Sequence, residues 1–344
     1  MGIVSYGAYL PQLTIFLAEI EKAQAKEVGS VSASLKVKQK TVPDFDEDSA
    51  TIAVEAAGQA LGRGGDKKKI SSLFIGSESH PYAVKPTGTM VAQALGLSEN
   101  LSTADLQFAC KAGTQALQIV ASFVLSGFGE QGLAIGADTA QAEPGDALEF
   151  TASAGGAAFV LGKTKLLAKM LATYSVAADI PDFWRRVGES YPQHAGRFTA
   201  EPAYFKQVFL ATRNLLTETK LKPQEIDFCI FHTPNGKFPR RAAKKLGFTQ
   251  EQLAPSLIVE QIGNTYAGAA MLALAAVLDQ AQPGQKILLT SYGSGAGADS
   301  FLFETTNLLA RKRKKWTNFV REQIAKLEKI DYQQYQALMK ARHH

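Results

Sequence analysis

A lone cysteine stands at the start of an apolar, alanine-rich run. The apolar spacing predicts a helix from Ala112 to Leu125, closed by Gly127, so Cys110 lies at or just before the first helical turn. There the helix dipole and free backbone N–H groups stabilise a thiolate and lower a cysteine pKa from about 8.5 toward about 4 to 7. The position therefore predicts a thiol that is nucleophilic at neutral pH. The alternative is a small buried apolar residue, the usual role of a free cysteine.

Comparison of the chain with itself pairs this cysteine with an asparagine. Cys110 ends a Gln-x-x-Cys pattern and Asn264 ends a Gln-x-x-Asn pattern, and a helical run follows each. Two further pairs of segments keep the same order at a similar separation of about 140 to 155 residues. They are 70–75 with 226–231, and 154–161 with 294–302. These matches predict a chain built from a duplicated α/β unit.

Two strand patterns of this repeat end at residues that could carry a proton. The apolar pattern at 70–75 leads into a polar loop with Glu78, and the pattern at 226–231 leads directly to His232. Strands that alternate with helices form mostly parallel sheets, and ligands bind at the carboxyl ends of their strands. Two halves packed about a pseudo-twofold axis would bring both residues to the cleft that holds the thiol and the asparagine. Together these side chains are suited to acyl transfer.

Each of these residues also has a structural interpretation. In this interpretation Glu78 is a solvated charge on a loop, and His232 is a core histidine with its hydrogen bonds satisfied. Asn264 is then only the cap of the helix that follows it. The Thr-Pro-Asn-Gly turn after His232 favours a cleft, and capping does not prevent a catalytic role for Asn264. Residue types and spacing leave both interpretations open.

Composition narrows the class of protein. The 344 residues suffice for two domains or one duplicated fold, and 46% hydrophobic with 20% charged residues is typical of a soluble globular protein. No apolar run approaches about 18 residues, and the N-terminus lacks a signal-peptide pattern, so we expect no membrane association. Cys110 and Cys229 offer no disulfide framework, which predicts a cytoplasmic location. The net charge of +5 is accounted for by the run 311–315, so it does not indicate nucleic-acid binding.

Longer motifs around these residues resemble a known family. They closely resemble archaeal-type hydroxymethylglutaryl-CoA synthases of the thiolase superfamily, over residues 1 to about 306 and more weakly beyond. The motifs that carry the resemblance are 76–86, 108–114, 136–139 and 234–239. The resemblance implies an internally duplicated, five-layered αβαβα fold. It divides the chain into thiolase-like halves at 1–165 and 166–306 and a basic, helical extension at 307–344.

The resemblance also implies a reaction, the condensation of acetyl-CoA with acetoacetyl-CoA to 3-hydroxy-3-methylglutaryl-CoA in the mevalonate pathway of isoprenoid synthesis. Cys110 would carry the acetyl group, and Glu78 would act as general acid and base. His232 and Asn264 would polarise the acceptor ketone or stabilise the oxyanion. A thioester keeps the methyl protons acidic because its carbonyl is poorly conjugated with sulfur, and a base in a dry cleft needs a raised pKa.

Further residues are assigned to the substrates by motif match. CoA carries phosphates, so basic residues are expected at the mouth of the cleft, while hydroxyl groups would contact the acyl portion. The basic residues are Arg197, Lys237 and Arg241, and the hydroxyl residues are Thr151, Thr199 and Ser294. A solvated helix face is the alternative for the basic residues, and a tight turn is the alternative for the glycine-rich loop 293–297. No metal site is predicted, and the CoA thioesters are substrates rather than cofactors.

The family resemblance implies a homodimer and a complex with an acetoacetyl-CoA thiolase and a small zinc-ribbon and OB-fold protein. The run 311–315 is a solvated face or a site for an acidic partner. One alternative activity is an initiating β-ketoacyl-ACP synthase, which needs no carboxylate base and so leaves Glu78 unexplained. An ordinary thiolase would carry a second cysteine where Ser294 stands. The other alternative is a non-catalytic thiolase-fold scaffold subunit.

Overall fold

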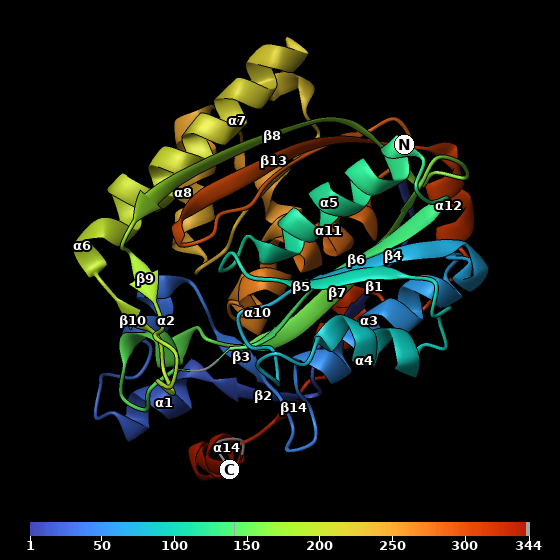
Figure 1. The fold of residues 1–344 in the computed structure, drawn as a ribbon. Helices are drawn as coiled ribbons and strands as arrows, with labels where there is room; N and C mark the ends of the chain where they lie inside the picture. The colour runs from blue at the N-terminus through green and yellow to red at the C-terminus, as the bar shows by residue number, and fades with distance from the viewer. Residues whose placement is uncertain (141, 342–344) are drawn as a thin grey trace.

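The computed structural model describes residues 1–140 and 142–341, which form a layered α/β assembly around one large sheet (Figure 1). The sheet has nine strands in the order β11-β12-β13-β8-β1-β7-β6-β4-β5. The strands from the first half of the chain are β1 (Gly2–Tyr9), β4 (Ile70–Gly76), β5 (Ser102–Leu106), β6 (Gln131–Thr139) and β7 (Ala154–Gly162). Those from the second half are β8 (Ala168–Ile180), β11 (Phe228–Phe231), β12 (Lys286–Thr290) and β13 (Gly295–Thr305).

The strand directions repeat between the two halves, as the duplicated unit requires. In the first half β4 runs parallel to β6, which is antiparallel to β7, which is antiparallel to β1. In the second half β11 runs parallel to β12, which is antiparallel to β13, which is antiparallel to β8. A short β1–β8 pairing joins the halves into one continuous sheet. The exits of β4 and β11 are therefore equivalent positions in the fold.

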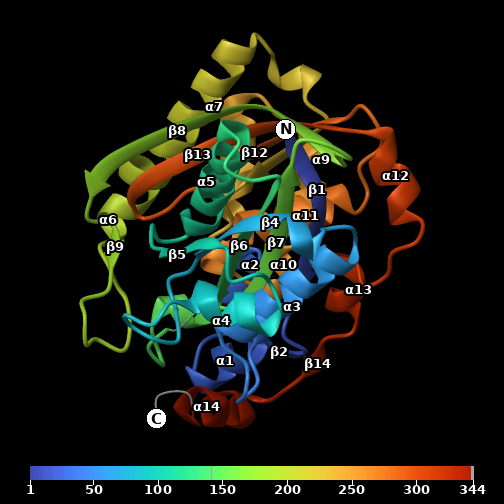
Figure 2. The ribbon, with the colours of Figure 1, turned by 45° about the vertical axis from the view of Figure 1, so that its right-hand side comes forward.

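Helices complete five layers. The outer layers are α3 (Ser49–Gly62) with α4 (Thr87–Ala94) on the first-half strands, and α7 (Lys206–Thr219), α8 (Lys237–Leu246) and α9 (Gln250–Leu253) on the second-half strands. The central helices α5 (Ala112–Ser126) and α11 (Ala269–Leu278) lie between the two sets of strands in both views (Figures 1 and 2). All ten residues of α11 are buried, because it packs against strands of both halves.

Local sequence explains the ends of these helices. Gly127 ends α5 in a left-handed conformation with φ of 86°, which glycine adopts without strain. The acidic residues and serine at 44–49 predict that Ser49 caps the helix that follows, but this is wrong. Ser49 is the first residue of α3 and Asp48 is the cap, with its carboxylate accepting from the backbone N–H of Thr51 at 2.8 Å.

A smaller sheet and short helices cover one end of the molecule. The strands are β2 (Leu13–Phe16), β3 (Gln39–Val42) and β14 (Glu328–Lys329), paired in the order β14-β2-β3. The short two-stranded sheet pairs β9 (Phe183–Trp184) with β10 (Gln193–His194). The remaining α-helices are α1 (Leu17–Ala23), α2 (Ser30–Leu35), α6 (Gly196–Phe198), α10 (Val259–Ile262), α12 (Asn307–Arg313), α13 (Val320–Ala325) and α14 (Tyr332–Ala341).

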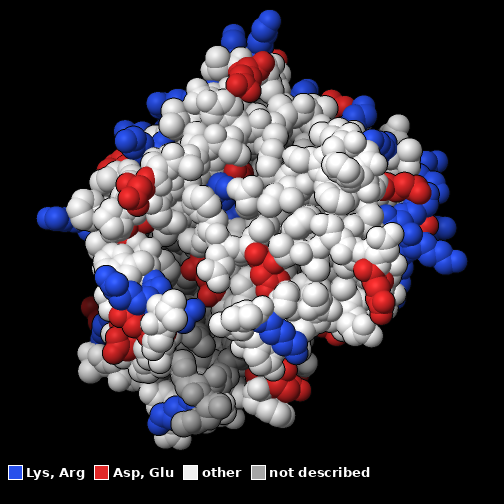
Figure 3. Space-filling view, in the orientation of Figure 1, with Lys and Arg blue, Asp and Glu red and all other residues white. Residues whose placement is uncertain are grey.

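Apolar and aromatic residues at helical spacing predict one helix across residues 316–342, but the C-terminal segment does not form one. It breaks into α13, β14 and α14, because the extended residues between the helices pair with β2. The last residue of that pattern, Arg342, lies outside the described residues. The first three residues of the basic run 311–315 end α12 and the last two follow it, in the region where Figure 3 shows Lys and Arg side chains gathered. Arg313 is not simply solvated, since its guanidinium donates to the carbonyls of Leu278 and Ala281.

Two findings bear on the function classes. No helix among the described residues is long and apolar enough to cross a membrane. Within the same residues, no group of three or more His, Cys, Asp or Glu side chains is arranged to hold a metal ion.

Candidate active site

Glu78 and Cys110 contact each other beyond the carboxyl end of β4. Glu78 lies two residues past that strand, and Cys110 lies in the turn before α5. The Cys110 thiol donates a hydrogen bond to the Glu78 carboxyl group, and Cys110 is only 7% exposed. Burial, followed by the nearby Asp138 carboxylate, raises the pKa of Glu78 to about 8. A carboxyl group with this pKa suits proton transfer near neutral pH.

The expectation of a lowered cysteine pKa is wrong. Burial, and then the negative charge of Glu78, raises the pKa of the Cys110 thiol well above its ordinary value. The backbone N–H groups at the start of the helix also stabilise a thiolate less than the sequence pattern predicts. The N–H groups of Lys111 and Ala112 already donate to the carbonyls of Phe108 and Ala109. The resting thiol is therefore protonated, with the Glu78 carboxyl group beside it.

Asp138, at the end of β6, holds the loop that carries Glu78. One carboxylate oxygen accepts from Ser77 Oγ at 2.7 Å, from the Glu78 backbone N–H at 2.7 Å and from Ser79 Oγ at 2.6 Å. The other oxygen accepts from the backbone N–H of Ala267 at 2.8 Å, in the second half of the chain. One buried carboxylate thus fixes the Glu78 loop relative to both halves.

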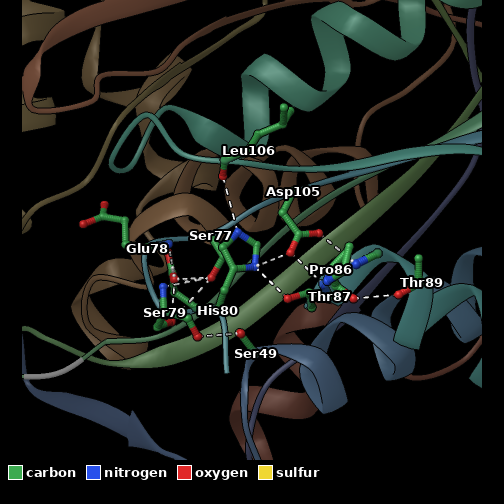
Figure 4. A network of polar contacts seen from close by, with 12 residues as sticks. Ser49, Ser77, Glu78, Ser79, His80, Pro86, Thr87, Thr89, Asp105 and Leu106 are labelled. Carbon is green, nitrogen blue, oxygen red and sulfur yellow. Dashed lines mark hydrogen bonds and ion pairs between the residues drawn. The ribbon is translucent and has the colours of Figure 1, made fainter. Parts of the chain in front are cut away.

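His80 braces the same loop from the other side. Its Nδ1 lies 2.8 Å from Thr87 Oγ1 and 3.5 Å from the Asp105 carboxylate, which also accepts from the backbone N–H groups that begin α4. Figure 4 shows these groups gathered around the imidazole, with the Glu78 carboxyl group turned away from them. His80 therefore makes hydrogen bonds with neighbouring residues at the start of α4 and in the adjacent strand β5.

His232 follows β11 and is held as a buried, neutral imidazole. Its backbone N–H donates to Thr290 and its carbonyl accepts from Tyr204 Oη at 2.7 Å. Burial lowers the pKa of His232 to about 3. Its Nδ1 is buried and has no hydrogen-bond partner among the described residues. An uncharged imidazole can donate to a substrate oxygen but carries no positive charge at neutral pH.

Tyr292 links the His232 side of the site to the Cys110 side. Its ring centroid lies 6.3 Å from that of His232, and a thiolate at Cys110 would raise the pKa of its phenol. The Tyr292 hydroxyl donates to Asp182, whose other oxygen accepts from the backbone N–H of Gly295 at 2.8 Å. Asp182 in turn raises the pKa values of Glu78 and Cys110.

Asn264 stands before α11, as the repeat predicts, and its backbone is tied to the first half. Its N–H donates to the Thr151 carbonyl at 2.7 Å, and its own carbonyl accepts from Ser153 at 3.0 Å. The side-chain oxygen accepts from the backbone N–H of Tyr266 at 3.0 Å. Tyr266, which follows Asn264 by two residues in the chain, packs in one small cluster with Cys110 and Ala152.

A cleft of about 650 Å³ opens over Glu78 and Tyr266. Its walls include Phe183 and Trp184 of β9, together with the acidic loop 46–48. The residues that line it are Phe45, Asp46, Glu47, Asp48, Ser77, Glu78, Ser79, His80, Pro81, Gln107, Ala109, Asp138, Thr139, Ala140, Phe183, Trp184, Arg185, Pro192, Tyr266 and Ala341. Its volume suits a small ligand, and the carboxylate of Glu78 lies at its wall.

Residues 216–305 match the family model of the 3-oxoacyl-[acyl-carrier-protein (ACP)] synthase III C terminal. Relatives match almost the whole chain. The hydroxymethylglutaryl-CoA synthase of Methanopyrus kandleri is 53% identical over 316 residues, 92% of this chain and 90% of that protein. The Methanocaldococcus jannaschii protein of the same name is 52% identical over 91% of both chains. This chain belongs to the hydroxymethylglutaryl-CoA synthase family.

Solved structures agree with the family. A structure of MvaS in complex with 3-hydroxy-3-methylglutaryl coenzyme A matches with a TM-score of 0.90 at 25% identity, over 98% of this chain and 91% of that one. A crystal structure of an HMG-CoA synthase complexed with CoA matches with a TM-score of 0.89 at 22% identity, over 97% and 89%. The thiolase-like fold expected from the sequence is confirmed.

The residues assigned to the substrates of a hydroxymethylglutaryl-CoA synthase fall into two groups. Thr151 and Ser294 lie beside the catalytic candidates, Thr151 through its bond to Asn264 and Ser294 through a hydrogen bond with Tyr292. The other four are Arg197 on α6, Thr199 directly after it, and Lys237 and Arg241 on α8. None of the six is among the residues that line the cleft over Glu78.

Two of the three basic residues in the second group already have partners. Arg241 pairs with Glu201 and lies 4.5 Å from the Phe205 ring centroid. Arg197 lies over the Phe198 ring at 4.7 Å. Lys237 is exposed at the start of α8, which packs against β11, the strand before His232. A phosphate that binds Arg197 or Arg241 would compete with these existing contacts.

Several buried groups near the site of this synthase were not predicted from the sequence. Asp138 was visible within the 136–139 motif and follows a strand next to β4, so its position could have suggested a link to Glu78. No local sequence pattern identifies Asp182, Tyr266 or Tyr292. Each of them interacts with a residue more than 100 positions away in the chain.

Proposed function

We propose that this chain condenses acetyl-CoA with acetoacetyl-CoA to give 3-hydroxy-3-methylglutaryl-CoA through an acetyl-Cys110 intermediate. The observation that carries the proposal is the buried contact between the Cys110 thiol and the Glu78 carboxyl group. A nucleophile and a base in hydrogen-bond contact are the minimum required for covalent acyl transfer. Relatives that share about half of its residues bear the name of this activity.

Acetylation starts from the protonated thiol. The carboxylate of Glu78 accepts the thiol proton as sulfur attacks the acetyl carbonyl, and the proton then leaves on the sulfur of departing CoA. The new bond joins the Cys110 sulfur to the acetyl carbon, and the bond that breaks joins that carbon to the CoA sulfur. Glu78 returns to its carboxylate form, ready for the next proton.

Condensation uses the same base. Glu78 removes a methyl proton from acetyl-Cys110, and the resulting enolate carbon attacks the ketone carbon of acetoacetyl-CoA. The ketone oxygen takes up the proton held by Glu78 and becomes the tertiary hydroxyl. His232 and Asn264 act as uncharged donors that stabilise the oxyanion before that protonation. Water then cleaves the thioester to Cys110, releasing the product carboxylate and regenerating the thiol.

We assign Thr151 and Ser294 to the acyl portion and Arg197, Thr199, Lys237 and Arg241 to CoA. The two thiolase-like halves, 1–165 and 166–306, each deliver one strand exit to the site. No cofactor beyond the CoA thioesters is required by these steps, and a cytoplasmic setting suits them.

The same proposal includes a homodimer. β5 lies at one end of the large sheet and pairs only with β4 among the described strands, which leaves one side of its backbone available to a second copy (Figure 1). A larger complex with an acetoacetyl-CoA thiolase and a zinc-ribbon and OB-fold protein would deliver the acceptor. Light scattering distinguishes the dimer from a monomer.

An acyl carrier protein is the competing donor. The match of residues 216–305 to an ACP-dependent synthase family favours this candidate, which would obtain its carbanion by decarboxylation. The proximity of Glu78 to Cys110 favours proton abstraction instead. Substrates therefore separate the two activities: malonyl-ACP would be consumed by one and acetoacetyl-CoA by the other.

Intact-mass analysis and product analysis test the proposal together. The protein is incubated with acetyl-CoA, and an acetyl adduct is expected on wild type and on Cys229→Ala but not on Cys110→Ala. Cys229 is the matched control because it is the chain's other buried cysteine. Addition of acetoacetyl-CoA is expected to give 3-hydroxy-3-methylglutaryl-CoA. An adduct that survives in Cys110→Ala, or no product from wild type, contradicts the proposal.

A further inference from the structure

A buried ion pair lies beside the nucleophile and takes no part in the steps above. Lys111 follows Cys110 in the chain, and its ammonium group lies 3.1 Å from the carboxylate of Asp299 on β13. The two side chains are 3% and 0% exposed. Removing two charges from water is costly, so such a pair persists only with good geometry and further hydrogen bonds.

Asp299 has those further bonds, and they join different layers of the fold. Its carboxylate accepts from Thr114 Oγ1 of α5 at 2.9 Å and from Ser175 Oγ of β8 at 2.7 Å. Thr114 also lies 2.7 Å from Ser291 Oγ, which follows β12. The carboxylate therefore ties the first turn of the helix after the nucleophile to three segments of the second half.

The Lys111 side chain, like that of Asp299, is surrounded by interacting groups. Its ammonium group also donates to the side chain of Gln115 and lies 4.4 Å from the centroid of the Phe108 ring. The glycine-rich loop 293–297 packs closely against the same turn. If Gly293 carried a side chain, its Cβ would lie 2.4 Å from the Phe108 carbonyl oxygen and 2.6 Å from Lys111 Cβ. The turn and the loop thus leave no room to shift relative to each other.

The turn itself needs such support. Ala109, immediately before the nucleophile, has φ of 44°, a left-handed conformation that is unfavourable for a residue with a side chain. Such a conformation persists when the surroundings determine it. The segment from Phe108 to Lys111 is enclosed by the second half of the chain, and that half also carries His232 and Asn264.

We propose that Lys111 and Asp299 are positioning residues, which hold the Cys110 sulfur in register with the groups of the second half. The inference rests on the proposed acetyl transfer and adds to it a specific charge pair that sets the place of the nucleophile. It differs from a contribution to stability alone. Replacing both members of a buried pair by neutral side chains is often neutral for stability, so stability and positioning can be separated.

The test is the double variant Lys111→Met with Asp299→Asn, which removes both charges. Thr114 and Ser175 donate to different oxygens of Asp299, so the amide keeps an acceptor for one hydroxyl and offers an N–H donor to the other. Its melting temperature is expected to stay near that of wild type. Its single-turnover rate of Cys110 acetylation by acetyl-CoA, followed by intact mass, is expected to fall about 10- to 100-fold, because small misplacements of a reacting group have effects of that size. The KM for acetyl-CoA is expected to remain unchanged.

Arg63→Met is the control for loss of a buried cation. Arg63 donates to the carbonyls of Thr317 and Tyr6 and touches none of the site residues described above, so its loss should lower the melting temperature without slowing acetylation. If the double variant does not fold, Asp299→Glu keeps both charges and displaces the carboxylate by one methylene, and its acetylation is expected to slow about tenfold.

The outcomes separate the two proposals. Wild-type acetylation rates in the folded variant overturn the positioning role and leave the proposed function intact. Absence of an adduct on wild type overturns the proposed function itself. A rate loss in Arg63→Met that matches that of the double variant assigns the effect to loss of a buried cation in general and also overturns the positioning role.

Discussion

The two strand exits of this molecule share a topology and differ in electrostatics. At the exit of β4, Glu78 is surrounded by the thiol of Cys110 and by the carboxylate of Asp138, and its pKa is raised to about 8. At the exit of β11, His232 is surrounded by aromatic rings, and its pKa is lowered to about 3. One exit can exchange protons near neutral pH, whereas the other is a fixed neutral group.

The difference has a physical cause in the neighbours of each exit. Carboxylates from two further strands or loops approach the Glu78 side, Asp138 through hydrogen bonds to its loop and Asp182 through its charge. On the other side Tyr204 and Tyr292 exclude water without offering a charge to His232. Duplication thus supplies two equivalent strand exits. Their different surroundings make Glu78 a base at one exit and His232 an uncharged donor at the other.

The largest expected effect follows from removing the base. Glu78→Gln is expected to lower the condensation rate about 10² to 10⁴-fold, the usual contribution of a positioned acid or base. An acetyl adduct on Cys110 should still form, more slowly than in wild type because the acceptor of the thiol proton is lost, since the variant also loses a negative charge that raises the thiol pKa. Product analysis measures the first result and intact mass the second. Normal product formation would remove Glu78 from the mechanism.

The second exit is tested by separating charge from hydrogen bonding. His232→Ala is expected to lower the condensation rate about 10² to 10³-fold, as loss of an oxyanion donor does. His232→Gln keeps an uncharged donor and should retain more activity. Because the wild-type imidazole is neutral above about pH 3, the wild-type rate should have no titration step from His232 near pH 6.5. A step in wild type that disappears in His232→Gln would contradict a neutral role.

The raised pKa of Glu78 also predicts a dependence of stability on pH. The folded pKa of about 8 exceeds the unfolded value of 4.5, so the folded state binds this proton more tightly. The resulting stability is present below about pH 4.5 and is lost as pH rises through about 8. Glu78→Gln should therefore have a larger free energy of unfolding than wild type at pH 9, by on the order of a few kcal/mol.

Chemical denaturation at pH 4 and pH 9 measures this effect. The two proteins should differ little at pH 4, where the carboxyl group is protonated in both folded and unfolded states. The exposed Glu27→Gln controls for loss of one negative charge and should show no comparable gain at pH 9. Equal stability of Glu78→Gln and wild type at pH 9 would mean that burial of Glu78 carries no cost.

The sequence predicted features that depend on local pattern. Strand and helix periodicity located β4 and α5 within one residue, and the internal repeat predicted that Glu78 and His232 leave equivalent strands. It gave the wrong pKa direction for Cys110, because that value depends on burial and on a carboxylate 32 residues away. It could not have found the pairing of Lys111 with Asp299, since neither residue has a pattern that identifies its partner.

The smallest expected effect concerns the cations predicted to bind CoA, which lie outside the cleft over Glu78. Arg241 pairs with Glu201 on the surface, where ion pairs contribute little, so Arg241→Gln is expected to raise the KM for acetyl-CoA only about two- to fivefold. Lys237→Gln, which removes an exposed cation from the same helix, is its matched comparison. Steady-state kinetics at low and high salt measures both, because contacts with phosphates weaken as salt rises. A change in kcat at constant KM would instead connect α8 to the chemistry of the His232 side.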